Sequence, residues 1–363
     1  MKSGLDDVVA AETVLSDVDG NAGRLIIRGA SLDDLVRSNR YEDVLALLLA
    51  GFIENLPEPG RIAAALGAAR TEVFAHLQAA DTEVLKSKPI EAVRALLARI
   101  ADSEDVATAL RLIAAPAVFT PGITRLQRGL EPIAPDPALS HAADILRMTH
   151  DCLPSAEQIA ALDTYLVTVS DHGLNASTFA ARVVASTHAG LTSAVLAALS
   201  ALKGPLHGGA PGPVLDMLDA IGRPEDAETW LEAALARHER LMGFGHRIYR
   251  VRDPRADALK AVVRNLVEAG QVDSRRMALG EAVEAAALSI LKRKKPDRPL
   301  QTNVEFYTAL LLEALGFTRD TFTCVFAIGR VGGWIGHARE QVLEGRLIRP
   351  QSRYVGPQPQ QAA

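Results

Sequence analysis

The sequence predicts a mainly α-helical protein with one small β hairpin near its N-terminus. Hydrophobic residues, mostly alanine and leucine, make up 48% of the chain and aromatic residues only 4%, a balance that favours helices packed closely on helices. From position 59 to 115, apolar residues recur at the spacing of one buried helix face. A chain of 363 residues is long enough for two domains, or for one large domain with a smaller lobe.

Composition excludes several classes of protein. The formal net charge of −5 argues against a nucleic-acid partner, because such proteins usually carry a basic face. The N-terminus has no signal segment, and no uninterrupted apolar run approaches the length of a membrane span. Cys152 and Cys324 stand in apolar surroundings and are predicted to be buried thiols in a reducing compartment. We therefore expect a cytoplasmic protein without a membrane partner, and the dispersed histidines predict no metal site.

The elements follow from local patterns. Residues 5–29 alternate apolar stretches around the turn dipeptide Asp19-Gly20, which predicts a hairpin. Ser31 is predicted to cap the start of a helix. Pro121-Gly122 is expected to break the long helical run. The three prolines between 131 and 140 predict a loop. Further helices are expected over 41–49, 141–150, 156–169, 214–240, 256–269, 277–290 and 308–315.

One stretch, MGFGHRIYRVRDPR at 242–255, carries the strongest chemical pattern. Its two glycines allow a tight turn directly before His246. Four arginines follow it, and Arg250 and Arg255 are among them. An imidazole beside guanidinium groups suits a site that holds an acidic substrate and moves a proton on it. The alternative is a solvated basic helix start with an incidental histidine.

Two other histidines stand at the ends of elements. His172 opens the stretch DHGLNAST, and His207 lies in the glycine- and proline-rich stretch LKGPLHGGAPGP. Loops between helices commonly display functional side chains, although both residues also fit ordinary loop or capping positions.

Charged residues complete the set of candidates. Glu305 lies between two apolar residues, where it is either a general base with a raised pKa or a carboxylate of the first helical turn. Arg330 and Arg349 each adjoin Gly or Pro and are candidate carboxylate forks. Lys292 and Lys294 belong to a basic turn, which suits either a phosphate contact or solvent. Together these residue types fit an aldol-type condensation, in which an enolate must be stabilised.

At this point the chain resembles a known family. GPLHGGA at 204–210, GFGHRIYRVRDPRA at 243–256, NVEFY at 303–307 and GRVGGWIGH at 329–337 are similar to the signature segments of citrate synthases. The opening and the tail match the short bacterial form of that family. The resemblance covers essentially the whole chain, and four motifs in the right order are far more specific than one glycine-rich match.

The resemblance implies a role for each matched residue. His207 would hydrogen-bond the thioester oxygen of acetyl-CoA, Glu305 would remove the methyl proton, and His246 would protonate the carbonyl of oxaloacetate. The residues implied to hold oxaloacetate are His172, Arg255, Arg330 and Arg349, and those implied to contact CoA are Arg250, Lys292 and Lys294.

The family fold is a two-domain helical fold. It implies a large domain in residues 1–210 that returns at 316–363 with the C-terminal tail, and a small inserted domain at 211–315. Arg349 would reach the site of a neighbouring subunit, which implies a homodimer. No prosthetic cofactor is implied, since acetyl-CoA is a co-substrate.

Two positions depart from the family pattern. Glu305 stands where the family usually has Asp, and Gly173 stands where many relatives have Glu. These departures keep two alternatives to citrate synthase open. One is a 2-methylcitrate synthase that uses propionyl-CoA, and the other is a non-catalytic protein that binds CoA or a dicarboxylate.

Overall fold

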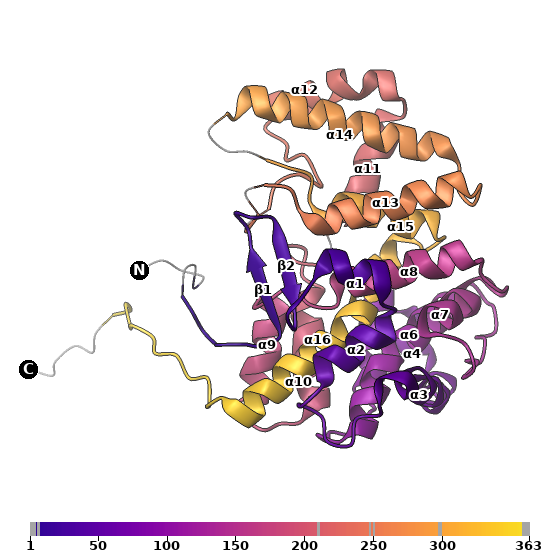
Figure 1. The fold of residues 1–363 in the computed structure, drawn as a ribbon, viewed down its shortest axis with the longest axis vertical. Helices are drawn as coiled ribbons and strands as arrows, with labels where there is room; N and C mark the ends of the chain where they lie inside the picture. Colours follow the sequence, from indigo (N-terminus) through magenta and orange to yellow (C-terminus); the bar gives the residue numbers. More distant parts are fainter. Residues whose placement is uncertain are drawn as a thin grey trace, which may run out of the picture.

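The computed structural model confirms a mainly α-helical fold (Figure 1). It describes residue 5 and residues 8–208, 211–246, 248–249, 251–296 and 300–357. The α-helices in this part of the chain are α1 (Leu32–Ser38), α2 (Tyr41–Leu49), α3 (Ile62–Gln78), α4 (Thr82–Lys86), α5 (Pro89–Leu97), α6 (Val106–Gln127), α7 (His141–His150), α8 (Ala156–Val169), α9 (Ala176–Ala185), α10 (Leu191–Leu202), α11 (Pro211–Ile221), α12 (Ala227–Ala236), α13 (Pro254–Glu268), α14 (Ser274–Lys294), α15 (Val304–Ala314) and α16 (Phe322–Glu344). Short 3-10 helices are η1 (Pro59–Arg61), η2 (Pro224–Asp226) and η3 (Arg319–Thr321).

The predicted hairpin is present, with a short third strand beside it. Strands β1 (Ser16–Asp19), β2 (Arg24–Ile27) and β3 (Ala30–Ser31) form one antiparallel sheet in the order β1-β2-β3. The turn after β1 packs so closely on Ile248 and Arg252 that a methyl group at Gly20 would overlap the carbonyl of Ile248 and one at Gly23 the carbonyl of Arg252. In Figure 1 the hairpin lies between the group that contains α13 and α14 and the group that contains α9, α10 and α16.

The expected break at Pro121-Gly122 is wrong, because α6 runs through it. Pro116 and Pro121 both lie inside this helix. Each proline removes one backbone hydrogen bond, but α6 is packed against α3, α5, α7 and α16, and burial on several sides outweighs that loss. Gly122 also allows Leu77 of α3 to approach the helix closely.

Helix α6 also corrects the expectation about apolar runs. It is long and apolar enough to cross a membrane by length and composition, yet 83% of its most apolar stretch is buried inside the protein, as in a core helix. A second correction concerns the cysteines, since Cys324 is buried but Cys152 is exposed in the connection between α7 and α8.

Helix α16 is the central element of the larger group of helices. It packs on α2, α6, α8, α9 and α10, and it is buried along most of its length. A methyl group at Gly333 would collide with the carbonyl oxygen of Ser170 and crowd Asp171, and one at Gly329 would collide with Val169. These glycines therefore let the end of α8 and the segment before His172 lie directly on α16.

A second group of helices, α11 to α14, lies at one end of the molecule in Figure 1. Helix α13 packs on α15 and also on α8 and α1, so it faces both groups. Asp253 caps the start of α13 and Asn303 caps the start of α15. The residues at these two helix starts carry the chemistry described next. The domain boundaries at 210 and 315 remain a prediction.

Candidate active site

His172 and His246 meet in the fold, and Tyr249 lies against both. The centroids of the two imidazole rings are 5.6 Å apart. The Tyr249 ring is centred 5.7 Å from His172 and 4.9 Å from His246. Its hydroxyl oxygen is 3.3 Å from Nε2 of His172, which stands 77 positions earlier in the chain. Two candidate residues from separate motifs therefore belong to one site.

The loop before His246 is shaped by its glycines, as the sequence predicts. Gly243 and Gly245 have φ values of +83° and +82°, in the left-handed region that side chains rarely adopt. Backbone hydrogen bonds of 2.8 and 2.9 Å join these glycines to residues 301–303. The loop is thereby held beside the start of α15, so His246 and Glu305 are positioned by one piece of backbone.

The hydrogen bonds of His246 determine which nitrogen carries its proton. Nδ1 accepts from the backbone N–H groups of Ile248 and Tyr249, both at 3.1 Å. In the neutral ring the proton is then on Nε2. Nε2 lies 3.3 Å from Nη2 of Arg255, which can only donate, so these two nitrogens do not bond each other in this tautomer and each can present an N–H to a ligand. Two adjacent donors suit a carbonyl or carboxylate oxygen of a substrate.

Arg255 is held by Asp253, which also fixes the start of α15. Nε and Nη2 of Arg255 donate to the two carboxylate oxygens at 3.0 and 2.9 Å. The same carboxylate accepts from the backbone N–H of Val304 at 3.1 Å. Burial lowers the pKa of Arg255, but the ion pair with Asp253 outweighs burial and leaves that pKa raised. One carboxylate thus links the guanidinium to the helix that carries Glu305.

Removal of the Asp253 carboxylate is expected to cost much stability. We expect Asp253→Ala to lower the free energy of unfolding by about 3–5 kcal/mol, because the Arg255 charge stays buried without its partner. Urea denaturation measures the loss. The matched control is Asp257→Ala, whose ion pair with Arg252 joins side chains that are 50% and 57% exposed and is expected to contribute less than about 1 kcal/mol. Equal losses in the two variants would contradict this prediction.

Arg330 adds a second buried cation. Its residue is 1% exposed, and its guanidinium lies 4.7 Å from the centre of the Phe326 ring. Burial lowers the pKa of Arg330 to about 10, so the group is still charged at neutral pH. Burial, and then the charges of Arg255 and Arg330, hold the pKa of His172 well below its usual value. A neutral imidazole beside two fixed cations suits an anionic ligand.

His207 lies in the turn after α10 and is held by Ser177. Its Nε2 is 2.8 Å from the Ser177 hydroxyl oxygen. That oxygen also accepts from the indole N–H of Trp334 at 3.2 Å and lies 2.8 Å from Oδ1 of Asn175. Burial, and to a smaller extent Arg330, lowers the pKa of His207 to about 4. The ring is therefore neutral near pH 7 and acts as a hydrogen-bonding group.

Glu305 lies in the first turn of α15 and is half-buried. Its backbone N–H donates to the capping Oδ1 of Asn303 at 3.1 Å. Burial raises the pKa of its carboxyl, and the charges of Arg255 and Arg240 lower it in part. Glu305 is therefore a first-turn carboxylate, and its raised pKa is compatible with the predicted role of a general base, which stays a prediction.

The remaining candidates are not brought to these groups in a single chain. Arg349 is exposed in the segment after α16, which leads away from the body of the protein in Figure 1. Lys292 and Lys294 are exposed in the last turn of α14. Arg250 lies outside the described residues. Within the described ranges, no group of three or more His, Cys, Asp or Glu side chains is placed to hold a metal ion.

A family model described as citrate synthase, C-terminal domain, matches residues 4–351. The chain belongs to the citrate synthase family. This assignment makes the protein an acyltransferase enzyme and sets aside the non-catalytic alternative.

Relatives and solved structures agree with the family assignment. The citrate synthase of Haloferax volcanii is 37% identical over 371 residues, covering 98% of this chain and 96% of the relative. The 2-methylcitrate synthase of Mycobacterium tuberculosis is 34% identical over 377 residues, covering 98% and 91%. The ternary complex of carboxymethyl coenzyme A and oxaloacetate with citrate synthase from Thermoplasma acidophilum has a TM-score of 0.87 at 28% identity, covering 100% of this chain and 98% of that one. Because the two relatives carry different activity names, membership in the citrate synthase family leaves the thioester open.

Sequence reasoning missed three residues that organise this citrate synthase site. Tyr249 bridges the two histidines, Asp253 holds Arg255, and Ser177 holds His207. A usable signal existed for Asp253, which precedes Pro254 at a helix start where acidic caps are common. Tyr249 and Ser177 are recognised only through contacts between distant segments.

Proposed function

We propose that this protein condenses acetyl-CoA with oxaloacetate and water to give citrate and CoA. The observation that carries the proposal is the cluster of His172, His246 and Arg255 beside the start of α15, where Glu305 lies. That arrangement combines donors for an anionic keto acid with a carboxylate of raised proton affinity. The ternary complex with carboxymethyl coenzyme A and oxaloacetate in a structural relative supports the same pair of ligands.

Oxaloacetate would be held by cations and neutral imidazoles. Arg255 and Arg330 would bind its carboxylates, with His172 as a further hydrogen-bonding group. The Nε2–H of His246 points to the keto oxygen in this arrangement, because Nδ1 is already occupied by two backbone donors. As the new carbon–carbon bond forms, His246 would give that proton to the oxygen, which becomes the hydroxyl of the product, and water would return a proton to the ring.

Acetyl-CoA would be enolised between Glu305 and His207. Glu305 removes a proton from the methyl carbon, and the electron pair moves toward the thioester oxygen. A His207 ring with its proton on Nδ1 would donate to that oxygen, and the Ser177 hydroxyl, which otherwise donates to Oδ1 of Asn175, would turn to Nε2 of His207 in that tautomer. The enol carbon then attacks the keto carbon of oxaloacetate. Water finally hydrolyses the thioester of the condensed intermediate, which releases citrate and CoA.

The predicted domain division gives this reaction a physical setting. We propose a large domain of residues 1–210 and 316–363 and a small domain of residues 211–315, with the site in the cleft between them. Closure of the cleft would exclude water while the enol exists, and opening would release the products. His207 lies close to the first boundary, so it is placed to act as part of the hinge.

Assembly and CoA binding remain proposals as well. The exposed tail that carries Arg349 is consistent with a homodimer in which this arginine enters the partner's site. The phosphates of CoA would be contacted by Arg250, Lys292 and Lys294. The two lysines are exposed, so a phosphate group can reach them. We place the enzyme in the cytoplasm, in keeping with a reaction on two charged metabolites.

A 2-methylcitrate synthase is the second candidate, because a relative at 34% identity carries that name. We expect kcat/KM for acetyl-CoA to exceed that for propionyl-CoA by about tenfold, since one methylene changes pocket preference by about 1–3 kcal/mol. Thiol release with oxaloacetate and each thioester at matched concentrations measures the ratio. A preference for propionyl-CoA would replace the first candidate by the second, and no thiol release with either would refute the condensation.

A further inference from the structure

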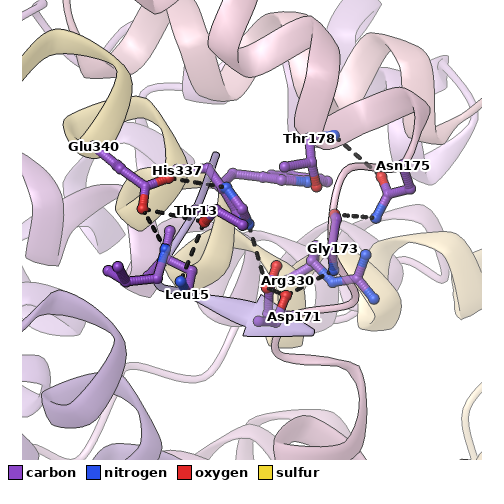
Figure 2. A network of polar contacts seen from close by, with 12 residues as sticks. Thr13, Leu15, Asp171, Gly173, Asn175, Thr178, Arg330, His337 and Glu340 are labelled. Carbon is purple, nitrogen blue, oxygen red and sulfur yellow. Dashed lines mark hydrogen bonds and ion pairs between the residues drawn. The ribbon is translucent and has the colours of Figure 1, made fainter. Parts of the chain in front are cut away.

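A buried polar network includes Asp171, the residue directly before His172. It consists of Asp171, Arg182, His337 and Glu340, whose exposed fractions are 0%, 3%, 0% and 1%. We call it the His172 network. It joins the segment before His172, helix α9, helix α16 and the N-terminal segment, as Figure 2 shows. None of the four residues has a role in the proposed reaction.

The hydrogen bonds of His337 fix the direction of the network. Nη1 of Arg182 lies 3.0 Å from Nδ1 of His337, and a guanidinium can only donate. Nδ1 is therefore an acceptor, and the proton of the neutral ring is on Nε2. Nε2 lies 3.2 Å from Oδ2 of Asp171, so His337 donates to that carboxylate. In the other tautomer Nδ1–H would face the Arg182 donor, and a bare Nε2 would face the Asp171 carboxylate, which can only accept.

Ser16 of β1 connects the network to both neighbours of His172. Its hydroxyl donates to Oδ2 of Asp171, the residue before His172. Its oxygen also accepts from the backbone N–H of Gly173, the residue after His172, at 2.9 Å. One side chain of the N-terminal hairpin therefore holds the carboxylate of the residue before His172 and the backbone N–H of the residue after it.

Glu340 ties the same N-terminal segment to α16. It accepts from Nη1 of Arg182 at 2.5 Å, from the backbone N–H of Val14 at 2.8 Å and from the Thr13 hydroxyl at 3.1 Å. β1 is thus anchored at Glu340 before it reaches Asp171. Oδ1 of Asp171 is buried without a hydrogen-bond partner among the described residues, but the bonds named above still restrain the network, because each group would lose a partner if it moved.

We propose that Ser16 and His337 are positioning residues. Through Asp171 and Gly173 they hold the His172 side chain in the position that binds oxaloacetate. The inference rests on the proposed role of His172. Neither residue touches the substrate. Loss of the Ser16 hydroxyl leaves the Gly173 N–H without its acceptor and removes one hydrogen bond to Asp171. The turn that carries His172 can then shift relative to Tyr249 and Arg255.

The first test is a comparison of Michaelis constants. We expect Ser16→Ala to raise KM for oxaloacetate about tenfold, as for the loss of one hydrogen bond to a charged group, while KM for acetyl-CoA changes less than about twofold. Ser16→Thr keeps the hydroxyl and is expected to restore the wild-type value. A Ser16→Ala enzyme with an unchanged KM for oxaloacetate would overturn the proposal.

Thr13→Val is the matched control. Thr13 belongs to the same segment and bonds the same network, but at Glu340 and not beside His172. We expect it to lower the melting temperature about as much as Ser16→Ala while leaving both Michaelis constants in place. If Thr13→Val raises KM for oxaloacetate as much as Ser16→Ala does, the effect is general loosening of the fold and the proposal fails.

A substrate-free measurement separates this inference from the proposed reaction. In protein with isotope-labelled histidine, assigned with a His172→Gln variant, Ser16→Ala is expected to shift the ring resonances of His172 and leave those of His207 unchanged. If wild-type protein does not bind oxaloacetate, the proposed function is wrong, yet the resonances still decide whether Ser16 positions His172. Unshifted His172 resonances would refute the positioning role.

Discussion

Replacement of Glu305 by glutamine is expected to lower kcat by a factor of about 10²–10⁴, the contribution typical of a general base. Glutamine has the same shape but cannot take a proton from the thioester methyl group. Binding of oxaloacetate should change little, because the donors for that substrate come from other residues. Thiol release measures kcat, and calorimetric titration with oxaloacetate measures affinity. Weak binding with a normal rate would show that another group removes the proton.

Glu305→Asp is the matched control for this prediction. It keeps the carboxylate and shifts it by one methylene, a displacement of about 1 Å that can cost up to about a hundredfold. We therefore expect it to stay faster than Glu305→Gln. If the two variants are equally slow, the position of the side chain matters and its basicity does not.

The same residue predicts a pH dependence. Burial raises the pKa of Glu305 above the usual 4.5, and only the ionised form can act as a base. As pH falls, kcat should therefore decline at a pH higher than an ordinary glutamate would give, and this acidic limb should be absent from the residual activity of Glu305→Gln.

His207→Ala is expected to lower kcat by a factor of about 10²–10³, because a donor to the developing oxyanion is lost. Affinity for oxaloacetate should be retained. Since the pKa of His207 is about 4, the neutral ring donates throughout the working range, and no limb of the wild-type pH–rate profile above pH 5 should belong to it.

Two measurements check the role of His207. Exchange of the methyl hydrogens of acetyl-CoA with deuterated solvent reports enolisation and should slow in His207→Ala as much as turnover does. The control is His76→Ala, which removes a histidine from the last turn of α3 and should leave both rates unchanged. Slow turnover with normal exchange would assign His207 to a later step.

The fold was predictable where local pattern and burial agree. The hairpin with its Asp19-Gly20 turn and most helices follow from spacing and caps. Helix α6 did not, because proline rules describe an isolated helix, and here packing on several sides overrides them at Pro121. The full length of α16 was hidden by its glycines, which are there for close packing and not for turns.

Several residues of the candidate site were predictable from the sequence, but the contacts between them were not. Local motifs indicated His172, His246 and Glu305, because imidazole and carboxylate side chains are recognised as possible acids and bases from residue type alone. Tyr249 and Ser177 act through partners far along the chain, and no local pattern names such a partner. The proposed place of Arg349 in a partner's site depends on contacts between two chains, which no local pattern describes.

None of the proposed catalytic residues lies in the N-terminal hairpin, yet its turn leaves no room for a methyl group against Ile248 and Arg252. Its other end is bonded beside His172 and at Glu340. If the segment that follows His246 moves, the hairpin must therefore move with it, or the contacts between the two must break. If the cleft closes as proposed, the first strands of the chain would limit that motion, so mutations there are expected to change the rates of closing and opening more than the rate of the chemical step.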